Sequence, residues 1–179
     1  MEYFDVLDER GQYTGKIETR GECHEKGLFH KAVALFIINS RNQVLLQKRS
    51  SSKRAWPNCW DISAGGHVLA GEFGFEAVIR ECEEELGLLI QEKDPLFIGA
   101  VTSCTTTPHD IHNHYNEFYI VRKDLEVDSL KLQTSEVSDV CWFERADIVQ
   151  KIQQHDPKLT EKEGCWEYLL KYYEWLDKK

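Results

Sequence analysis

Glutamates crowd the stretch that precedes Gly87, and their spacing could gather three carboxylates in one place. If residues 73–86 form a helix, each residue turns it by about 100°, which brings three glutamates into one arc. These three are Glu81, Glu84 and Glu85, while Glu83 points roughly the opposite way. Like charges three and four residues apart weaken a helix. A hard divalent cation, which prefers oxygen ligands, would offset that repulsion.

The same helix carries a separate apolar stripe. Its members are Phe75, Val78, Ile79, Cys82 and Leu86. A helix with one apolar and one charged side packs its apolar side against the core. The sequence therefore predicts a helix that buries one side and presents carboxylates on another. A merely solvated acidic face is the plainer alternative, because most charge runs have no further role.

The segment that contains this helix resembles the Nudix box, G-x5-E-x7-R-E-U-x-E-E-x-G-U, in which U is a bulky apolar residue. The positions that fit are Gly66, Glu72, Arg80, Glu81, Glu84, Glu85, Gly87 and Leu88. One position departs from the pattern: Cys82 occupies the first U, where a buried thiol acts as a small hydrophobe. So many fixed positions make the pattern far more specific than a lone glycine motif.

This resemblance to the MutT-like Nudix hydrolase superfamily implies a fold and a chemistry. Nudix domains are α/β/α sandwiches with a mixed central sheet, in which the box forms a loop-helix-loop. Nudix enzymes cleave a diphosphate bond in a nucleoside diphosphate derivative or a related organic diphosphate, with Mg²⁺ or Mn²⁺ as cofactor. Divalent cations serve this chemistry by bridging phosphate oxygens and neutralising charge.

The resemblance also assigns roles to the matched positions. The implied metal ligands are Glu81, Glu84, Glu85 and the backbone of Gly66. The implied catalytic residues are Glu81, Glu84 and Arg80, with Arg80 orienting the carboxylates by paired hydrogen bonds. The general base is Glu81 or an acid in a neighbouring loop, and the box leaves both open. Glu72 is expected to hold the loop against the helix.

Residues 3–122 also resemble the isopentenyl-diphosphate isomerase branch of this superfamily. The similar stretches are Arg20 to His30, Leu45 to Pro57 and Trp60 to His67. The resemblance implies a second metal site at His24, His30, His67 and Glu117. It also implies that Arg20, Arg49 and Lys53 contact the substrate diphosphate. Isopentenyl-diphosphate delta-isomerase is therefore the alternative function.

Two features favour a hydrolase over the isomerase, and a third concerns the second metal site. The isomerase carries a catalytic cysteine directly before its Gly-His pair, where this chain has Gly65. The isomerase has a degraded box, whereas this chain keeps all the acids. The spacing between His24 and His30 is also one residue shorter than in the isomerase.

Length and composition restrict the class of protein. The chain has 179 residues, 41% hydrophobic and 30% charged, which is typical of one soluble globular domain. We expect a single Nudix domain over 1–179, with its core at about 28–155, a hairpin at 3–17 and a C-terminal helix at 160–176. The net charge of −9 disfavours a nucleic-acid partner. No apolar run reaches the roughly 20 residues of a membrane helix.

The cysteines bear on the cellular compartment. There are 6 of them, widely scattered and never in a C-x-x-C arrangement, which is typical of reduced thiols. The first residues show no secretory signal. The sequence therefore predicts a cytoplasmic protein whose partner is a small-molecule diphosphate.

The remaining elements must position these residues. Strands are expected at 4–7, 15–17, 32–39, 44–48, 60–63, 96–103, 117–121 and 137–143, and further helices at 146–154 and 160–176.

Three other patterns each have two interpretations. His109, His112 and His114 are expected in a polar loop, where they either reach the substrate or a second metal or are simply solvated. The basic segment 48–54 either binds phosphate or aids solubility. A helical stripe near the C-terminus is expected to pack in the core, with a homodimer interface as the alternative. Its members are Trp166, Leu169, Leu170, Tyr173 and Leu176.

Overall fold

The computed structural model describes residues 1–106, 111–162 and 164–179, which form a two-stranded sheet, a larger mixed sheet and four α-helices. The two-stranded sheet consists of β1 (Tyr3–Leu7) and β2 (Tyr13–Thr19). The larger sheet contains β3 (His30–Ile38), β4 (Val44–Arg49), β5 (Trp60–Asp61), β6 (Ala64–His67), β7 (Leu96–Thr106), β8 (Ile111–Arg122) and β9 (Val137–Phe143). The helices are α1 (Arg20–Lys26), α2 (Gly74–Leu86), α3 (Arg145–Gln153) and α4 (Cys165–Leu176), with a 3₁₀ turn at Val127–Ser129.

The central strand of the larger sheet is β3. The strand order is β5-β4-β3-β8-β7, with β6 also paired to β3 and β9 to β4. β3 runs parallel to β8, from His30 opposite His114 to Ile38 opposite Arg122. Its other edge is shared, because β6 pairs with residues 32–35 and β4 with residues 37–38. The first half of β3 therefore lies between β6 and β8.

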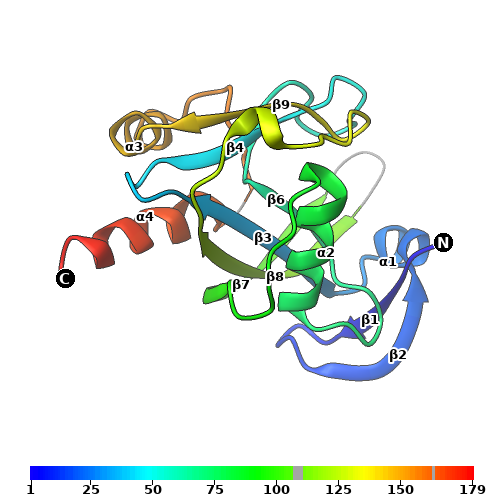
Figure 1. Cartoon of the computed structure of the whole chain (residues 1–179). Coiled ribbons are helices and arrows are strands. Elements are labelled where there is room, and N and C mark those ends of the chain that lie inside the picture. The colour runs from blue at the N-terminus through cyan, green and yellow to red at the C-terminus, as the bar shows by residue number, and fades with distance from the viewer. Residues whose placement is uncertain (107–110, 163) are drawn as a thin grey trace.

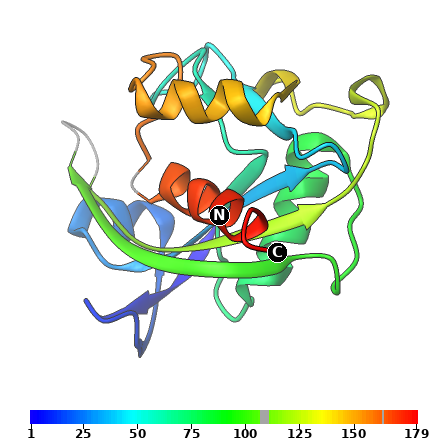
Figure 2. The same ribbon diagram turned by 90° about the vertical axis from the view of Figure 1, so that its left-hand side faces the viewer.

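The two faces of β3 are covered by different helices. Side chains along a strand alternate between its faces. The even-numbered residues from Ala34 to Ile38 pack with α3 and α4, whereas the odd-numbered residues from Val33 to Ile37 pack with α2. Figure 1 shows α2 and α4 on opposite sides of β3, and in Figure 2 the long β7–β8 hairpin curves beneath α4. The architecture is an α/β/α sandwich with a mixed sheet, which confirms the predicted fold class.

The helix α2 forms as the spacing of its residues predicts. Val78, Cys82 and Leu86 are buried in the core against β3 and β8. Gly87 ends the helix with a φ of 64°, a left-handed conformation that glycine adopts without a steric penalty. The terminal stripe on α4 also packs in the core, with Trp166, Leu169 and Tyr173 buried.

Several boundaries differ from the predicted ones. The sequence analysis does not predict α1, which is short and capped by the Thr19 hydroxyl. The predicted strand at 60–63 is shorter in the structure, because β5 ends at Asp61 and a separate strand, β6, begins at Ala64. The predicted helix at 160–176 begins only at Cys165, since Thr160 and its neighbours pair with Trp60 instead. No helix within the described ranges is long and apolar enough to cross a bilayer.

Candidate active site

A cavity of about 640 Å³ brings together most of the charged residues that the sequence singles out. Carboxylates of α2 form part of its wall: Glu81, Glu84 and Glu85. Basic residues from α1 and the loop after β4 form another part: Arg20, Arg49 and Lys53. Gly65 and Gly66 of β6 also line this cavity, together with several histidines.

Glu85 is the deepest of the three carboxylates, with 7% of its surface exposed. Its Oε2 accepts hydrogen bonds from the Gly65 backbone N–H at 3.0 Å and from the Gln47 amide at 3.1 Å. Both donors are neutral. Burial, together with the nearby Glu81 carboxylate, raises the pKa of Glu85 to about 8. A bound cation would favour the ionised form of this carboxyl group.

Arg80 fixes the loop of the box to the helix. Its Nε and Nη2 each bind the Glu72 carboxylate at 2.9 Å, a bidentate pair. Its Nη1 binds Oε1 of Glu81 at 2.7 Å, and its Nη2 also donates to the carbonyl oxygen of His67 at 2.9 Å. Glu72 in turn accepts the Leu69 backbone N–H at 2.8 Å. The positioning roles expected for Arg80 and Glu72 match these contacts.

Gly66 lies directly against the Glu81 carboxylate. A Cβ atom at position 66 would lie 2.3 Å from Oε1 of Glu81 and 2.8 Å from its Oε2. Such distances are far below van der Waals contact, so no other residue fits here without movement. The glycine therefore lets the carboxylate approach the backbone of β6.

Glu84 is the most accessible of the three acids. Its side chain is 53% exposed, and its closest cation is Nη1 of Arg80 at 3.5 Å. The three carboxylates share one cavity, but within the described ranges their oxygens are less tightly gathered than the ring nitrogens of the histidines. All three carboxylates nevertheless line the same cavity.

Four histidines lie close to one another among the described residues and form the histidine cluster: His24 of α1, His30 of β3, His67 of β6 and His114 of β8. One ring nitrogen from each lies within 4.8 Å of the others. The parallel register sets His30 beside His114, with ring centroids 4.7 Å apart. The ring of His112 lies next to this group, 4.8 Å from that of His24.

The histidine cluster presents buried lone pairs. Nδ1–H of His30 donates to the Leu28 carbonyl oxygen at 2.8 Å, which leaves Nε2 as the acceptor. The Nε2 atoms of His30 and His114 are buried without a hydrogen-bond partner among the described residues. Burial lowers the pKa of His30 to about 4 and that of His114 to about 2. Neutral imidazoles of this kind are ligands for borderline transition metals such as Zn²⁺.

Glu117, expected as a ligand beside these histidines, faces away from them. Residues three apart on a strand lie on opposite faces, so Glu117 and His114 point to different sides of β8. The Glu117 carboxylate binds Nζ of Lys31 at 3.0 Å and accepts the Tyr119 hydroxyl at 2.7 Å. The structure thus places His114 in the group instead of Glu117.

The expected His-rich loop is mostly strand. His112 and His114 belong to β8, and their spacing of two places both on the face that carries the histidine cluster. That alternation could have revealed a metal-binding face if the segment had been recognised as a strand. His109 lies outside the described residues.

The basic residues of the cavity already have acidic partners. Arg20 binds Glu2 at 2.9 Å, and Lys53 forms an ion pair with Glu136. Arg49 binds Asp61 at 3.0 Å. A further cation, Lys162, lines the same cavity and also binds Asp61. The sequence analysis does not single out Lys162, because it lies far from the box along the chain.

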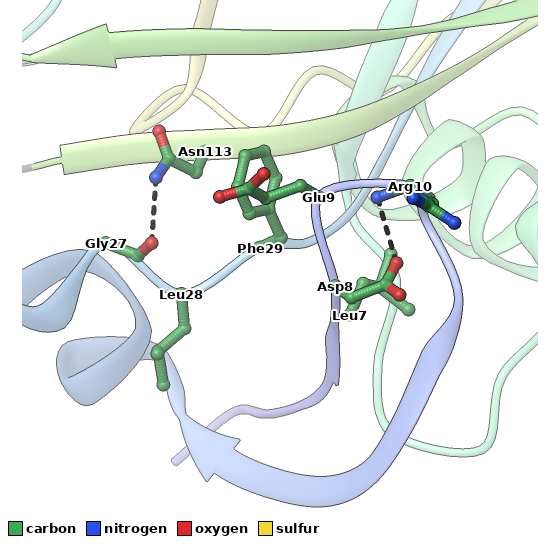
Figure 3. Close-up of a pocket in the computed structure, with 8 residues that line it drawn as sticks. All are labelled: Leu7, Asp8, Glu9, Arg10, Gly27, Leu28, Phe29 and Asn113. Carbon is green, nitrogen blue, oxygen red and sulfur yellow. Dashed lines mark hydrogen bonds between the residues drawn. The ribbon is translucent and has the colours of Figure 1, made fainter.

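A second hollow of about 550 Å³ lies where the β1–β2 hairpin meets the end of α1 (Figure 3). Asn113 donates to the Gly27 carbonyl oxygen across it at 2.8 Å. The Asp8 carboxylate in this hollow accepts hydrogen bonds from the backbone N–H groups of Arg10 and Gln12, both at 2.9 Å. Among the described residues, this hollow is lined neither by the α2 carboxylates nor by the histidines of the larger cavity.

Comparison with known proteins bears on the family. The NUDIX domain family matches residues 28–162. An uncharacterized Nudix hydrolase of Listeria monocytogenes is 34% identical over 150 residues, which cover 83% of each chain. Nudix hydrolase 3 of Arabidopsis thaliana is 35% identical over 161 residues, 87% of this chain but 21% of that protein's length. This chain therefore spans only about a fifth of that relative.

An isomerase and a solved structure are also similar. Isopentenyl-diphosphate Delta-isomerase of Escherichia coli is 30% identical over 151 residues, 84% of this chain and 81% of the isomerase. A crystal structure of a Deinococcus radiodurans protein superposes with a TM-score of 0.70 at 23% identity, over 95% of this chain and 98% of that one. At that identity the superposition bears on the fold alone. With a family match across most of its length and the box residues arranged around one cavity, the chain belongs to the NUDIX domain family.

Proposed function

We propose that this protein is a metal-dependent Nudix hydrolase that cleaves a diphosphate bond in a nucleoside diphosphate derivative or a related organic diphosphate. The observation that carries the proposal is the shared cavity, in which three carboxylates of α2 face the same space as several basic side chains. Family membership supports the same reaction class.

The α2 carboxylates suit Mg²⁺ or Mn²⁺. Oxygen ligands are those that such cations prefer, and Glu85 is a buried carboxyl group whose hydrogen-bond donors are both neutral. Glu81, Glu84 and Glu85 would hold the ion, with the backbone of Gly66 beside them. When bound, the cation would neutralise charge on the phosphate oxygens and lower the pKa of an attacking water.

The chain's own residues would position the reactants. Arg80 holds Glu81 in a fixed orientation, because the same guanidinium is anchored on Glu72. Arg20, Arg49 and Lys53 would bind the phosphate groups, with Lys53 exchanging Glu136 for substrate. Water is partly excluded here, since Glu81 has a side chain only 14% exposed. A low local dielectric strengthens each of these charge interactions.

Substitution of Glu84 tests the proposal directly. Glu84→Gln should lower Mg²⁺-dependent release of phosphate by roughly 100-fold or more, because the variant removes charge from the metal site. The fold should survive, since Glu84 is more than half exposed. Glu83→Gln is the matched control, because Glu83 is an exposed acid on the same helix. If both variants lost activity equally, the role of the helical face would be refuted.

We also propose that the histidine cluster holds a second metal ion. The buried Nε2 atoms of His30 and His114, which lack hydrogen-bond partners among the described residues, support this. A set of imidazoles without a carboxylate suits Zn²⁺ or another borderline transition metal better than Mg²⁺. With His114 in the expected place of Glu117, the site would therefore prefer a borderline transition metal.

Metal analysis of the purified protein tests the second site. We expect about one equivalent of a transition metal after dialysis against Mg²⁺, and its loss in His30→Ala and His114→Ala. His155→Ala is the control, because His155 is exposed and lies in the turn after α3. Retention of metal in both cluster variants would rule out this site without affecting the hydrolase proposal.

The alternative function is isopentenyl-diphosphate delta-isomerase, favoured by the relative of that name. Against it, a Cβ atom at Gly65 would lie 2.4 Å from the Val33 carbonyl oxygen, so this backbone has no room for a cysteine there. We expect no incorporation of solvent deuterium into isopentenyl diphosphate when Mg²⁺ and Zn²⁺ are present. NMR measures this incorporation. Robust incorporation would establish the isomerase and overturn the hydrolase.

A further inference from the structure

Asp61 is a wholly buried carboxylate at the edge of the cavity, and each of its oxygens has two donors. Oδ1 accepts the backbone N–H of Ile62 and the hydroxyl of Thr160, both at 2.9 Å. Oδ2 accepts Nη1 of Arg49 at 3.0 Å and Nζ of Lys162 at 2.6 Å. Two cations are thus held next to each other on one oxygen atom.

The charges at this end of the cavity do not balance. Arg20 and Lys53 each have a carboxylate of their own, Glu2 and Glu136. Arg49 and Lys162 share Asp61, and the ion pairs of both run to Asp61 alone among the described residues. Burial tends to raise the pKa of Asp61, but Lys162 and Arg49 outweigh it and keep the group ionised. Two positive charges on one negative charge give the group of Arg49, Lys162 and Asp61 a net positive charge, and the exposed Glu161 also lines this cavity.

Both cations retain donors for a ligand. Arg49 uses Nε for the Ala55 carbonyl oxygen and Nη1 for Asp61, so Nη2 can donate elsewhere. Lys162 has three N–H donors and uses one of them on Asp61. Their side chains are 14% and 29% exposed, which reduces screening by solvent.

The segment that leads to Lys162 is hydrogen-bonded to β5 and α4. Trp60 donates its N–H to the Lys158 carbonyl oxygen at 2.7 Å, and Thr160 donates its N–H to the Trp60 carbonyl oxygen at 3.0 Å. The indole N–H of Trp166 donates to the Thr160 carbonyl oxygen at 2.7 Å. Lys162 therefore follows two residues after Thr160, whose backbone N–H and carbonyl oxygen are both hydrogen-bonded.

We propose that Lys162 is a substrate-binding residue that forms, with Arg49, an anion site for a phosphate group of the substrate. The inference rests on the proposed function and adds a residue outside the Nudix box to it. The two cations would bind phosphate oxygens, while the α2 carboxylates, which line the same cavity, would hold the metal. Asp61 keeps the two like charges together when no substrate is bound.

Binding of methylenediphosphonate, a diphosphate analogue that cannot be hydrolysed, tests the anion site. Calorimetric titration in EDTA removes the contribution of metal, so the result does not depend on catalysis. We expect the wild-type protein to bind the analogue and Lys162→Met to bind it at least tenfold more weakly. Lys162→Arg should retain most of the affinity, because a charged donor remains. Lys158→Met is the control: Lys158 is exposed, lies four residues away, and should leave binding unchanged.

A second variant guards against a folding defect, because Lys162 contacts a buried carboxylate. Lys162→Gln keeps a donor for Asp61 but removes the charge, so it should fold and still lose at least tenfold in affinity. Wild-type affinity in a folded Lys162→Gln, or absence of analogue binding by the wild type, would overturn the inference. Loss of activity in Glu84→Gln with unchanged analogue binding in EDTA would support both proposals separately.

Discussion

Gly66 is the residue at which the smallest substitution should disturb the site most. An added methyl carbon would lie 2.3 Å from Oε1 of Glu81, so the carboxylate or the backbone of β6 must shift. A displacement of about 1 Å at a reacting centre can cost roughly 100-fold in rate. We therefore expect Gly66→Ala to lose Mg²⁺-dependent hydrolysis by about that factor, measured as initial rate at saturating substrate.

Gly21→Ala is the matched control for this prediction. A Cβ atom at Gly21 would meet no atom within 4 Å, and the residue lies in α1. Alanine favours a helix over glycine by about 1 kcal/mol, so this variant should be as active as the wild type and slightly more stable. Full activity in Gly66→Ala would show that the approach of Glu81 to β6 is irrelevant to turnover.

For single residues, the sequence predicted side-chain positions that depend on one helix or strand. Glu81, Glu84 and Glu85 are set by the pitch of one helix, and their shared cavity follows from their spacing. The pair of Asp61 and Lys162 joins positions 101 residues apart. No periodicity within an element can bring such residues together, so that contact was invisible in the sequence.

The end of α2 depends on a backbone conformation that only glycine adopts readily. Gly87 has a φ of 64°, and its N–H donates to the Glu83 carbonyl oxygen at 2.9 Å. An alanine here pays roughly 1–2 kcal/mol for the left-handed conformation, and its Cβ would lie 2.7 Å from Cβ of Lys131. We expect Gly87→Ala to lower the free energy of unfolding by at least that amount, measured by urea denaturation.

Gly15→Ala separates the two contributions. Gly15 has a φ of 79° on β2, and a Cβ atom there would meet nothing within 4 Å. This variant should lose only the conformational term, and so less stability than Gly87→Ala. Equal losses would mean that the contact with Lys131 costs nothing, and wild-type stability in Gly87→Ala would contradict the assignment of the helix end.

Elements with a regular apolar period were predictable, and polar ones were not. The core strand β3 is a nearly continuous apolar run, because both its faces are buried, and the helix α2 carries a helical apolar period. The first half of β8 instead presents His112 and His114 on one face, and histidines do not mark a strand. α1 spans only seven residues and buries two of them, so it has too little apolar surface to show a period. α4 starts late because backbone pairing with Trp60 competes with the helix.

The buried histidines connect the stability of the whole molecule to pH. In the metal-free protein, burial holds the pKa of His30 at about 4, below the ordinary 6.5, and that of His114 at about 2. Between the folded and unfolded values the unfolded chain binds more protons at these histidines, so their contribution to stability falls as pH falls below about 6.5. The slope is about 1.4 kcal/mol per pH unit for each histidine that stays neutral. Urea denaturation in EDTA from pH 7.5 to 4.5 measures it.

Two variants identify the source of this slope. His114→Gln removes one buried imidazole and should flatten the dependence, whereas the exposed His155→Gln should leave it unchanged. Burial raises the pKa of Glu85 to about 8, which acts in the opposite direction over the same window, so the histidine contribution is the difference in slope between the wild type and His114→Gln. Equal slopes in His114→Gln and the wild type would show that the folded protein accepts a proton at His114.

The parallel pairing of β3 with β8 governs the order in which a newly made chain can fold. Contacts across it join residues such as Ser40 and Asp124, 84 positions apart, and contacts over such distances slow folding. During synthesis the apolar strand 30–38 leaves the ribosome before its parallel partner β8. One of its edges therefore stays unpaired until the antiparallel β7–β8 hairpin has formed. During that interval its open edge can pair with other nascent strands. Cellular yield should therefore depend on chaperones and on translation speed between residues 39 and 122 more than on the final stability.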